Sequence, residues 1–362
     1  MIKPKERVIY IDLLRILSIF AVIVLHVSAI RWYSTNVASN NWLILNIYDS
    51  AVRWCVPVFI MISGVFFLNP NKSIDNKKLY MKYILKIILA LLVTSFFYYF
   101  FIAILNGQKI DINFIKTSSL YFLQGKVRYH LWFMYVIVSL YIVTPILRTF
   151  IRGAERRDIE YFILVAIIFS TLIPLLSSFS TFNKYFSSLN KINIPLGYSL
   201  YFVSGYYLFK YNIKELKKKI IYIIGVLAFI FTVIATWRMS LIENTPKSIF
   251  YEYLTPNVVM MSFSIFLFFK DFISKINIKR KCSEVIVLLS KLSFFIYLIH
   301  DAILTLILKT RLEVLLDRSL FGILILTLII YIISLIISLL FQILYKKILE
   351  FVKKVHNLTL LM

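Results

Sequence analysis

Hydrophobic side chains occupy long runs of this chain, and short polar or charged segments separate the runs. A helix needs about 20 mostly apolar residues to cross the hydrocarbon core of a bilayer. Ten runs approach that length, of which the second and sixth are short: residues 8–30, 50–68, 83–105, 131–150, 159–176, 195–211, 220–241, 253–272, 285–307 and 319–345. The pattern predicts an all-α polytopic membrane protein of about ten transmembrane helices, forming one domain over residues 1–362 with no soluble domain.

Basic residues indicate how these helices cross the membrane. Lys and Arg gather at the two termini and in the gaps after the even-numbered runs, about twice as many as in the alternate gaps. Positive charge in short loops is retained on the cytoplasmic side. We therefore predict that both termini are cytoplasmic.

Composition agrees with a membrane protein rather than a nucleic-acid-binding one. The chain is 60% hydrophobic and carries a formal net charge of +24. In a soluble protein this charge would suggest nucleic acid as a partner. Here the basic residues lie between membrane-spanning runs, so we expect no nucleic acid. The expected partners are the lipid bilayer, whose inner leaflet is anionic, and any anionic substrate on that side.

The first hydrophobic run contains three ionisable side chains, Asp12, Arg15 and His26. A charged group in hydrocarbon costs on the order of 2.5–3.5 kcal/mol, so such residues usually face the protein interior. At ~100° per residue the three positions fall within ~60° of one another on a helix. We predict one polar stripe, with Asp12 and Arg15 near the cytoplasmic surface and His26 near the outer one. A purely structural Asp12–Arg15 pair is the alternative.

Two more histidines share the predicted depth of His26. His130 opens the fourth helix at its outer end, and His300 lies near the outer end of the ninth. Arg53 and Glu252, at the predicted outer starts of the second and eighth helices, can reach the same layer. We expect these side chains to converge in the outer third of the bilayer.

Each of these residues also has a structural interpretation. Trp132, close to His130, is typical of an interfacial anchor, and Arg53 and Lys291 are long enough to snorkel to the headgroups. A buried histidine can serve only to donate a hydrogen bond to a helix carbonyl. Because membrane interiors rarely retain such groups without a role, we favour a functional role for His26 and His300.

The small pair Ser63–Gly64 predicts that another helix approaches the second helix closely.

Four segments in this order resemble the acyltransferase-3 family of bacterial integral-membrane O-acyltransferases: YIDLLRILSIFAVIVLHVSAI, VRWCVPVFIMISGVFFL, YHLWFMYVIVSLYIVTPIL and LSKLSFFIYLIH. The chain is most similar to members that acetylate enterobacterial common antigen and to the membrane half of vancomycin-resistance serine racemases. The resemblance implies a multi-pass enzyme of the bacterial cytoplasmic membrane.

Site residues follow from this resemblance, position by position. The arginine and histidine of the family's first helix fall on Arg15 and His26, and the arginine before its VPxFFMISG run falls on Arg53. The tyrosine and histidine near the end of the ninth helix fall on Tyr297 and His300. The resemblance implies catalytic roles for these five. It further implies no permanently bound cofactor, an acyl-CoA co-substrate (acetyl-CoA) and an acceptor hydroxyl on a cell-surface or lipid-linked polysaccharide.

The remaining polar residues complete the hypothesis. We expect substrate contacts from Asp12, His130, Trp132 and Glu252, and acyl-CoA contacts from Arg15 and Lys291. In this mechanism the thioester passes Arg15 to reach the histidine layer. There His26, whose side chain normally titrates near neutrality, acts as general base on the acceptor hydroxyl.

Two other function classes remain open from sequence. One is a permease or exporter for a small solute or a polysaccharide. Transporters often show repeated halves and paired broken helices, and we find neither pattern in the sequence. The other is a structural subunit of a glycan-assembly complex, for which substitutions in the polar layer would be silent.

Overall fold

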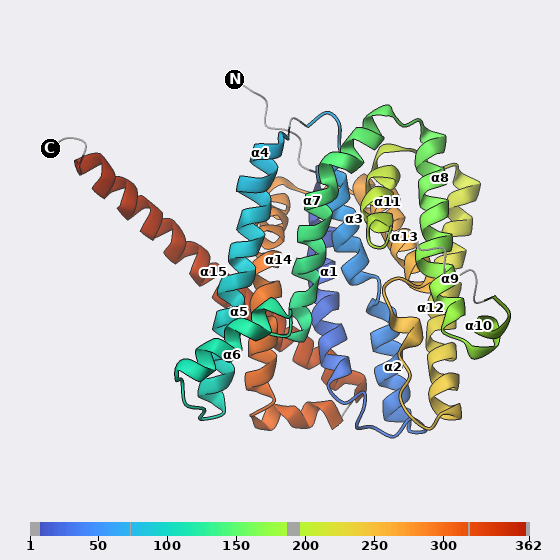
Figure 1. The fold of residues 1–362 in the computed structure, drawn as a ribbon, viewed down its shortest axis with the longest axis horizontal. Helices are drawn as coiled ribbons and strands as arrows, with labels where there is room; N and C mark the ends of the chain where they lie inside the picture. Colours follow the sequence, from blue (N-terminus) through green and yellow to red (C-terminus); the bar gives the residue numbers. More distant parts are fainter. Residues whose placement is uncertain (1–7, 73, 187–195, 318, 360–362) are drawn as a thin grey trace.

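A computed structural model describes residues 8–72, 74–186, 196–317 and 319–359, and within these ranges it contains helices and no strands. The helices form one bundle (Figure 1). Its long elements are α1 (Ile9–Ala29), α2 (Asn40–Val52), α3 (Cys55–Phe67), α5 (Leu85–Leu105), α7 (Trp132–Gly153), α8 (Arg156–Ile167), α12 (Glu215–Ile242), α13 (Pro256–Asp271), α14 (Arg280–Ile307) and α15 (Ser319–Thr359).

Shorter elements connect or extend these helices. The α-helical ones are α4 (Asn76–Lys78), α6 (Ile112–Leu123), α9 (Ile173–Ser177), α10 (Ser180–Phe186) and α11 (Ser199–Lys210). Two π-helical turns, η1 (Leu79–Ile84) and η3 (Ile168–Leu172), lead into α5 and α9. The 3-10 turns are η2 (Tyr129–Leu131), η5 (Ile249–Tyr251), η6 (Ile273–Lys275) and η7 (Arg311–Asp317).

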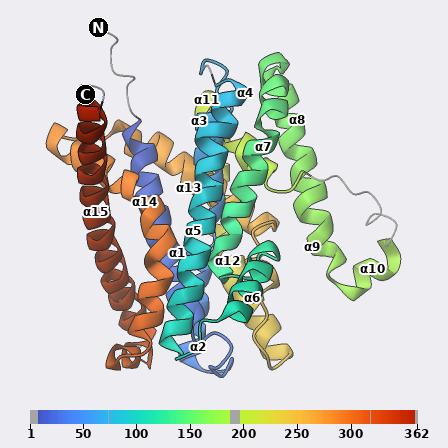
Figure 2. The ribbon, with the colours of Figure 1, turned by 60° about the vertical axis from the view of Figure 1, so that its left-hand side comes forward.

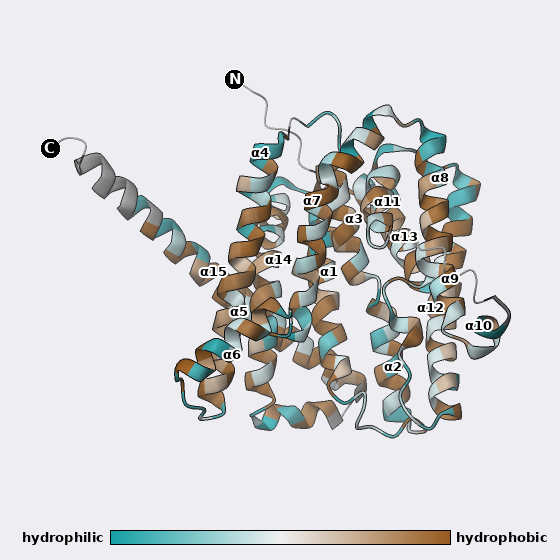
Figure 3. Ribbon diagram, in the orientation of Figure 1, coloured by the Kyte–Doolittle hydropathy of each residue, from teal (hydrophilic) through white to brown (hydrophobic). Residues whose placement is uncertain are grey.

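Hydropathy along the bundle fits a protein that crosses a membrane. Apolar residues cover its middle, whereas hydrophilic residues gather at both ends (Figure 3). We call the end where α1 begins the basic face, because loops there carry Lys72, Arg156, Lys214 and Lys279; the opposite end is the far face. Lys3, Lys5 and Arg7, which entered the topology prediction, lie outside the described residues.

The predicted number of spans needs one correction. Nine helical stretches of the described chain are long and apolar enough to cross a membrane. The sixth predicted run is instead the 12-residue helix α11, in which residues 200–203 are fully buried. Its apolar residues face other helices rather than lipid, which hydropathy alone does not distinguish. The last run is confirmed as long, since α15 has 41 residues and extends away from the bundle (Figure 1).

The second span is longer than predicted and is broken in its middle. It runs over Asn40–Phe67, with a turn at residues 53–54 between α2 and α3. Pro57 has no N–H to donate to the carbonyl of Arg53, so the helix loses a hydrogen bond at this point. The predicted position of Arg53 at the outer start of a helix is therefore wrong: it lies inside the span.

The close helix approach predicted at Ser63–Gly64 is confirmed, and its partner is α11. A Cβ atom at Gly64 would lie 1.8 Å from the carbonyl oxygen of Phe202, and one at Gly205 would lie 2.1 Å from that of Met61. Glycines on both helices thus bring the two backbones into contact. This contact holds α11 inside the bundle although it is too short to span the membrane.

We expect Gly205→Ala to destabilise the bundle, because its methyl group has no room beside the backbone of Met61. Overpacking in a core typically costs about 1–3 kcal/mol, and thermal unfolding of the purified protein in detergent measures the loss. Gly153→Ala is the matched control, since nothing lies within 4 Å of its added Cβ. Equal melting temperatures for the two variants would contradict the contact.

Candidate functional site

Three histidines from distant parts of the chain meet inside the bundle, as predicted. His26 comes from α1, His130 from η2 and His300 from α14. The ring centroids of His26 and His300 are 5.3 Å apart and the rings are stacked. The His130 ring lies 5.1 Å from His300 and 6.4 Å from His26. The depth predicted for each histidine from the sequence therefore identifies this cluster.

His300 has a defined tautomer. Its Nδ1 lies 2.7 Å from the carbonyl oxygen of Tyr297, and a carbonyl can only accept, so Nδ1 carries the proton. Nε2 is then a lone-pair acceptor, and it is buried without a hydrogen-bond partner among the described residues. Both ring nitrogens of His130 are likewise buried without such a partner within these ranges. Among the described residues, Nε2 of both His130 and His300 is therefore left without a hydrogen-bond partner.

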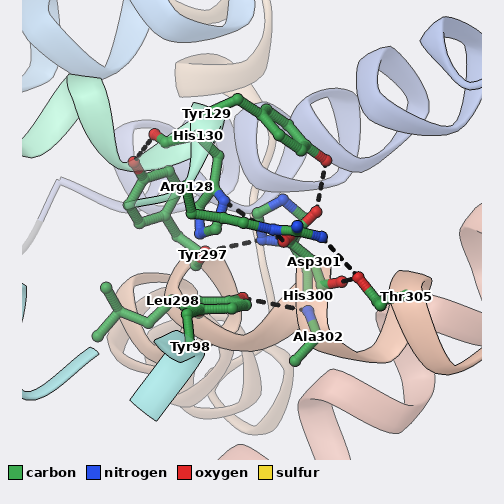
Figure 4. Close-up of polar contacts among 10 residues, drawn as sticks. All are labelled: Tyr98, Arg128, Tyr129, His130, Tyr297, Leu298, His300, Asp301, Ala302 and Thr305. Carbon is green, nitrogen blue, oxygen red and sulfur yellow. Dashed lines mark hydrogen bonds and ion pairs between the residues drawn. The ribbon is translucent and has the colours of Figure 1, made fainter. Parts of the chain in front are cut away.

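The Asp301 side chain, on α14, holds the segment that precedes α7 (Figure 4). Its carboxylate, 1% exposed, accepts hydrogen bonds from the Arg128 guanidinium and, at 2.5 Å, from the Tyr129 hydroxyl. Arg128 also donates to Thr305 at 2.7 Å. The Nδ1 atom of His130 lies 3.7 Å from the same carboxylate. Asp301 thus fixes the three consecutive residues that end in His130.

Arg128 lies just outside the spanning segments, so its ionisation bears on this link. Burial lowers the pKa of the Arg128 guanidinium, the Asp301 carboxylate raises it, and the net pKa is above the ordinary value. The guanidinium consequently stays charged at every physiological pH.

Two tyrosines complete the attachment. The Tyr297 hydroxyl donates to the carbonyl oxygen of His130. The Tyr98 hydroxyl donates to the carbonyl of Leu298 at 2.9 Å and accepts from the N–H of Ala302 at 3.1 Å, joining α5 to α14. Tyr297, expected to be catalytic, therefore positions His130 through its backbone.

Sequence analysis assigned no role to Asp301, Arg128, Tyr129 or Tyr98. The signals were present: Asp301 follows His300 directly, and Arg128–Tyr129 precede His130. A carboxylate next to a deep histidine needs a partner, but the sequence does not say which of the basic residues at that end supplies it.

Arg53 occupies the break between α2 and α3. It pairs with Asp49 at 2.5 Å, lies over the Tyr251 ring at 4.1 Å and donates to the Tyr251 carbonyl at 3.3 Å. Its charge lies within electrostatic range of His26. The expectation that Arg53 reaches the histidine layer is therefore supported from a different position in the helix.

Glu252 and Trp132 are less closely tied to the imidazoles. The Glu252 side chain is exposed and forms no hydrogen bond or ion pair with another described residue. Trp132 begins α7, and its ring packs 5.3 Å from Tyr253 and 5.8 Å from Tyr198. Their substrate roles stay predictions.

The stripe predicted on the first helix is confirmed, because all three of its ionisable residues face α14. The Ser290 hydroxyl donates to Asp12 at 2.5 Å and accepts from Arg15 at 3.4 Å, while His26 stacks on His300. Ser290 thereby links the two charged residues of α1 at the end near the basic face.

Two neighbouring cavities extend inward from the basic face toward this cluster. The basic-face cavity, about 850 Å³, is lined by Asp12, Arg15, Lys72 and Lys78 among others. The inner cavity, about 290 Å³, extends from Arg15 to Tyr297 and is also lined by Lys291. Both cavities share Arg15, Tyr83 and Tyr141. The inner cavity extends as far as Tyr297, which lies one helical turn from His300; among the described residues that line the two cavities there is no histidine.

Comparison with known proteins was made for the whole chain. The model of the acyltransferase-3 family, described as an acyltransferase domain, matches residues 8–343. No curated protein and no solved structure matches the chain.

A double-mutant cycle tests the link between Arg128 and Asp301. We expect Arg128→Gln and Asp301→Asn to be coupled by about 1–3 kcal/mol in thermal unfolding, because they share one buried contact. Arg280 and Glu284, an exposed pair 3.1 Å apart on α14, serve as control and should couple by no more than about 0.5 kcal/mol. Additive effects at Arg128 and Asp301 would show that the contact does not hold η2.

Proposed function

Since the chain belongs to the acyltransferase-3 family, we propose that it moves an acyl group, acetyl in the first instance, from cytoplasmic acyl-CoA to a hydroxyl of a cell-surface or lipid-linked polysaccharide. Family membership supports a membrane acyltransferase in general. The observation that carries the finer proposal is the pair of cavities that share Arg15 and extend from the basic face to Tyr297, whose hydroxyl contacts the backbone of His130 in the cluster of three imidazoles.

The donor enters from the basic face, which we assign to the cytoplasm. Lys72, Lys78 and Arg15 line the way in, and ammonium and guanidinium groups are the usual protein partners of phosphates. The inner cavity beyond Arg15 is lined largely by apolar side chains, including Phe59, Phe133 and Met134. These apolar side chains suit the uncharged thioester arm of the donor.

Acyl transfer then takes place at the imidazoles. His26 accepts the proton of the acceptor hydroxyl as the oxygen attacks the thioester carbonyl, forming a C–O bond. The tetrahedral intermediate collapses with cleavage of the C–S bond, and the departing thiolate takes the proton from His26 to give free CoA. General-base catalysis of this kind contributes about 10²–10⁴-fold to the rate.

Neighbouring groups support the two charged stages of this reaction. The Nε atom of Arg53 is buried without a hydrogen-bond partner among the described residues, so it keeps a donor for the developing oxyanion. The free Nε2 of His300 accepts a hydrogen bond and so orients the acceptor hydroxyl. His130 closes the cluster on a third side.

A transporter remains the second candidate, because the structure packs the two short predicted runs against each other. α3 begins at a break in its span, and α11 packs against it with only 12 residues. Discontinuous helices of this kind line substrate sites in many transporters.

We expect His26→Ala to reduce acetyl transfer in isolated membranes by at least about 100-fold, the lower limit of a lost general base. Immunoblotting should show unchanged protein in the membrane. His356→Ala is the control, since position 356 lies beyond the family match. Activity retained by His26→Ala would remove His26 from the mechanism.

Labelled acetyl-CoA distinguishes the two candidate functions. We expect label to appear in the glycans of inverted membrane vesicles that contain the protein, with mass spectrometry identifying the acetyl ester. Solute uptake that requires the protein, together with unlabelled glycans, would support the transporter. Label transfer that is unaffected by every substitution in the histidine cluster would assign the chain a structural role.

A further inference from the structure

The inner cavity has an unbalanced charge. Three cationic residues line it, Arg15, Lys86 and Lys291, and no carboxylate is among its described lining residues. Arg15 is linked through Ser290 to the Asp12 carboxylate, whereas no carboxylate among the lining residues offsets the charges of Lys86 and Lys291. Such a cavity attracts an anion.

Lys86 and Lys291 are the two cations without a protein partner. Neither forms a hydrogen bond or an ion pair with another residue in the described part of the chain. Each lies 10 or 11 residues from the basic-face start of its span, Asn76–Leu105 or Arg280–Ile307, which is about 15 Å along a helix. Both lysines thus lie on the basic-face side of the apolar part of their spans, and an anion bound there would offset the cost of their charges beside hydrocarbon.

The two lysines flank a side opening between α5 and α14. Both are exposed, as are their neighbours Leu85 and Leu89 on α5 and Phe294 on α14. Toward the far face the two helices are joined by Tyr98, whose hydroxyl contacts the α14 backbone. Nearer the basic face α1 is visible between them (Figure 2), and there the inner cavity lies behind Lys86 and Lys291.

We propose that an anionic phospholipid of the surrounding leaflet binds in this opening, with its phosphate between the ammonium groups of Lys86 and Lys291. Its chains lie along the exposed apolar faces of α5 and α14, and its headgroup closes the inner cavity toward the hydrocarbon. The site goes beyond acyl transfer and does not depend on it.

Charge and position together favour a lipid over a soluble anion. Leu85, Leu89 and Phe294 around the opening face hydrocarbon in a spanning bundle, where lipid is the only abundant carrier of phosphate. A nucleotide entering from the basic face meets Lys72 and Lys78 first. The prediction that Lys291 contacts acyl-CoA is the competing assignment, and the experiment separates the two.

Native mass spectrometry of the full-length protein in uncharged detergent measures the binding. Phosphatidylglycerol is the probe, phosphatidylcholine the neutral-headgroup comparison and glycerol 3-phosphate the soluble phosphate. We expect Lys86→Gln/Lys291→Gln to weaken phosphatidylglycerol binding at least tenfold while leaving phosphatidylcholine binding and the melting temperature unchanged. Lys86→Arg/Lys291→Arg should retain binding, and glycerol 3-phosphate should not compete.

The matched control is Lys82→Gln/Lys346→Gln, which removes the same charge from exposed positions that line neither the basic-face nor the inner cavity. It should bind phosphatidylglycerol within twofold of the unaltered protein. Equal loss in this control, or unchanged binding in Lys86→Gln/Lys291→Gln, overturns the proposal. Competition by glycerol 3-phosphate also overturns the proposal. If Lys86→Gln/Lys291→Gln loses only acyl-CoA binding, the proposal is likewise overturned and both lysines are assigned to the donor.

Discussion

The ion pair between Asp301 and Arg128 is the contact on which the histidine cluster depends. A carboxylate that is 1% exposed inside a membrane bundle is costly unless charged and hydrogen-bonding partners surround it. Arg128 and Tyr129 provide those partners, and both precede His130 directly. Satisfying one buried charge therefore fixes the start of α7 against α14, and the His130 ring comes to lie 5.1 Å from that of His300.

The same requirement explains why irregular backbone is tolerated in the interior. The break between α2 and α3 lies within a span, where exposed backbone groups would be unsatisfied in lipid. It is covered by η5 and α11, and the Arg53 guanidinium that it places there is paired with Asp49 and stacked on Tyr251. The broken helix brings the positive charge of Arg53 to the depth of His26. A continuous helix that faced lipid would not retain a charge at this depth, because the charge would have no partner there.

Much of this arrangement follows from sequence, because hydropathy and loop charge define how deep each residue lies. Depth alone brought His26, His130 and His300 together, and the 3.6-residue period placed Asp12, Arg15 and His26 on the face that contacts α14. Depth does not specify which helices are neighbours. Contacts between neighbouring helices determine the pairing of Asp301 with Arg128, the position of Arg53 at a break and the burial of α11. The sequence gives only indirect signs of such contacts: Gly64 marks the close approach of α11, and Pro57 marks the break.

The cations near the imidazoles and those in the inner cavity differ in whether carboxylates neutralise them. This difference determines which part of the donor can lie in each place along the proposed transfer path. Around the imidazoles, Arg53 and Arg128 are neutralised by Asp49 and Asp301. In the inner cavity, Lys86 and Lys291 have no carboxylate beside them within the described chain. The inner cavity therefore attracts a free anion more strongly than the surroundings of the imidazoles do. On the acyl-transfer proposal this gradient holds the phosphates of the donor toward the basic face, and the uncharged thioester is the part that continues past Tyr297 to His26 and His300.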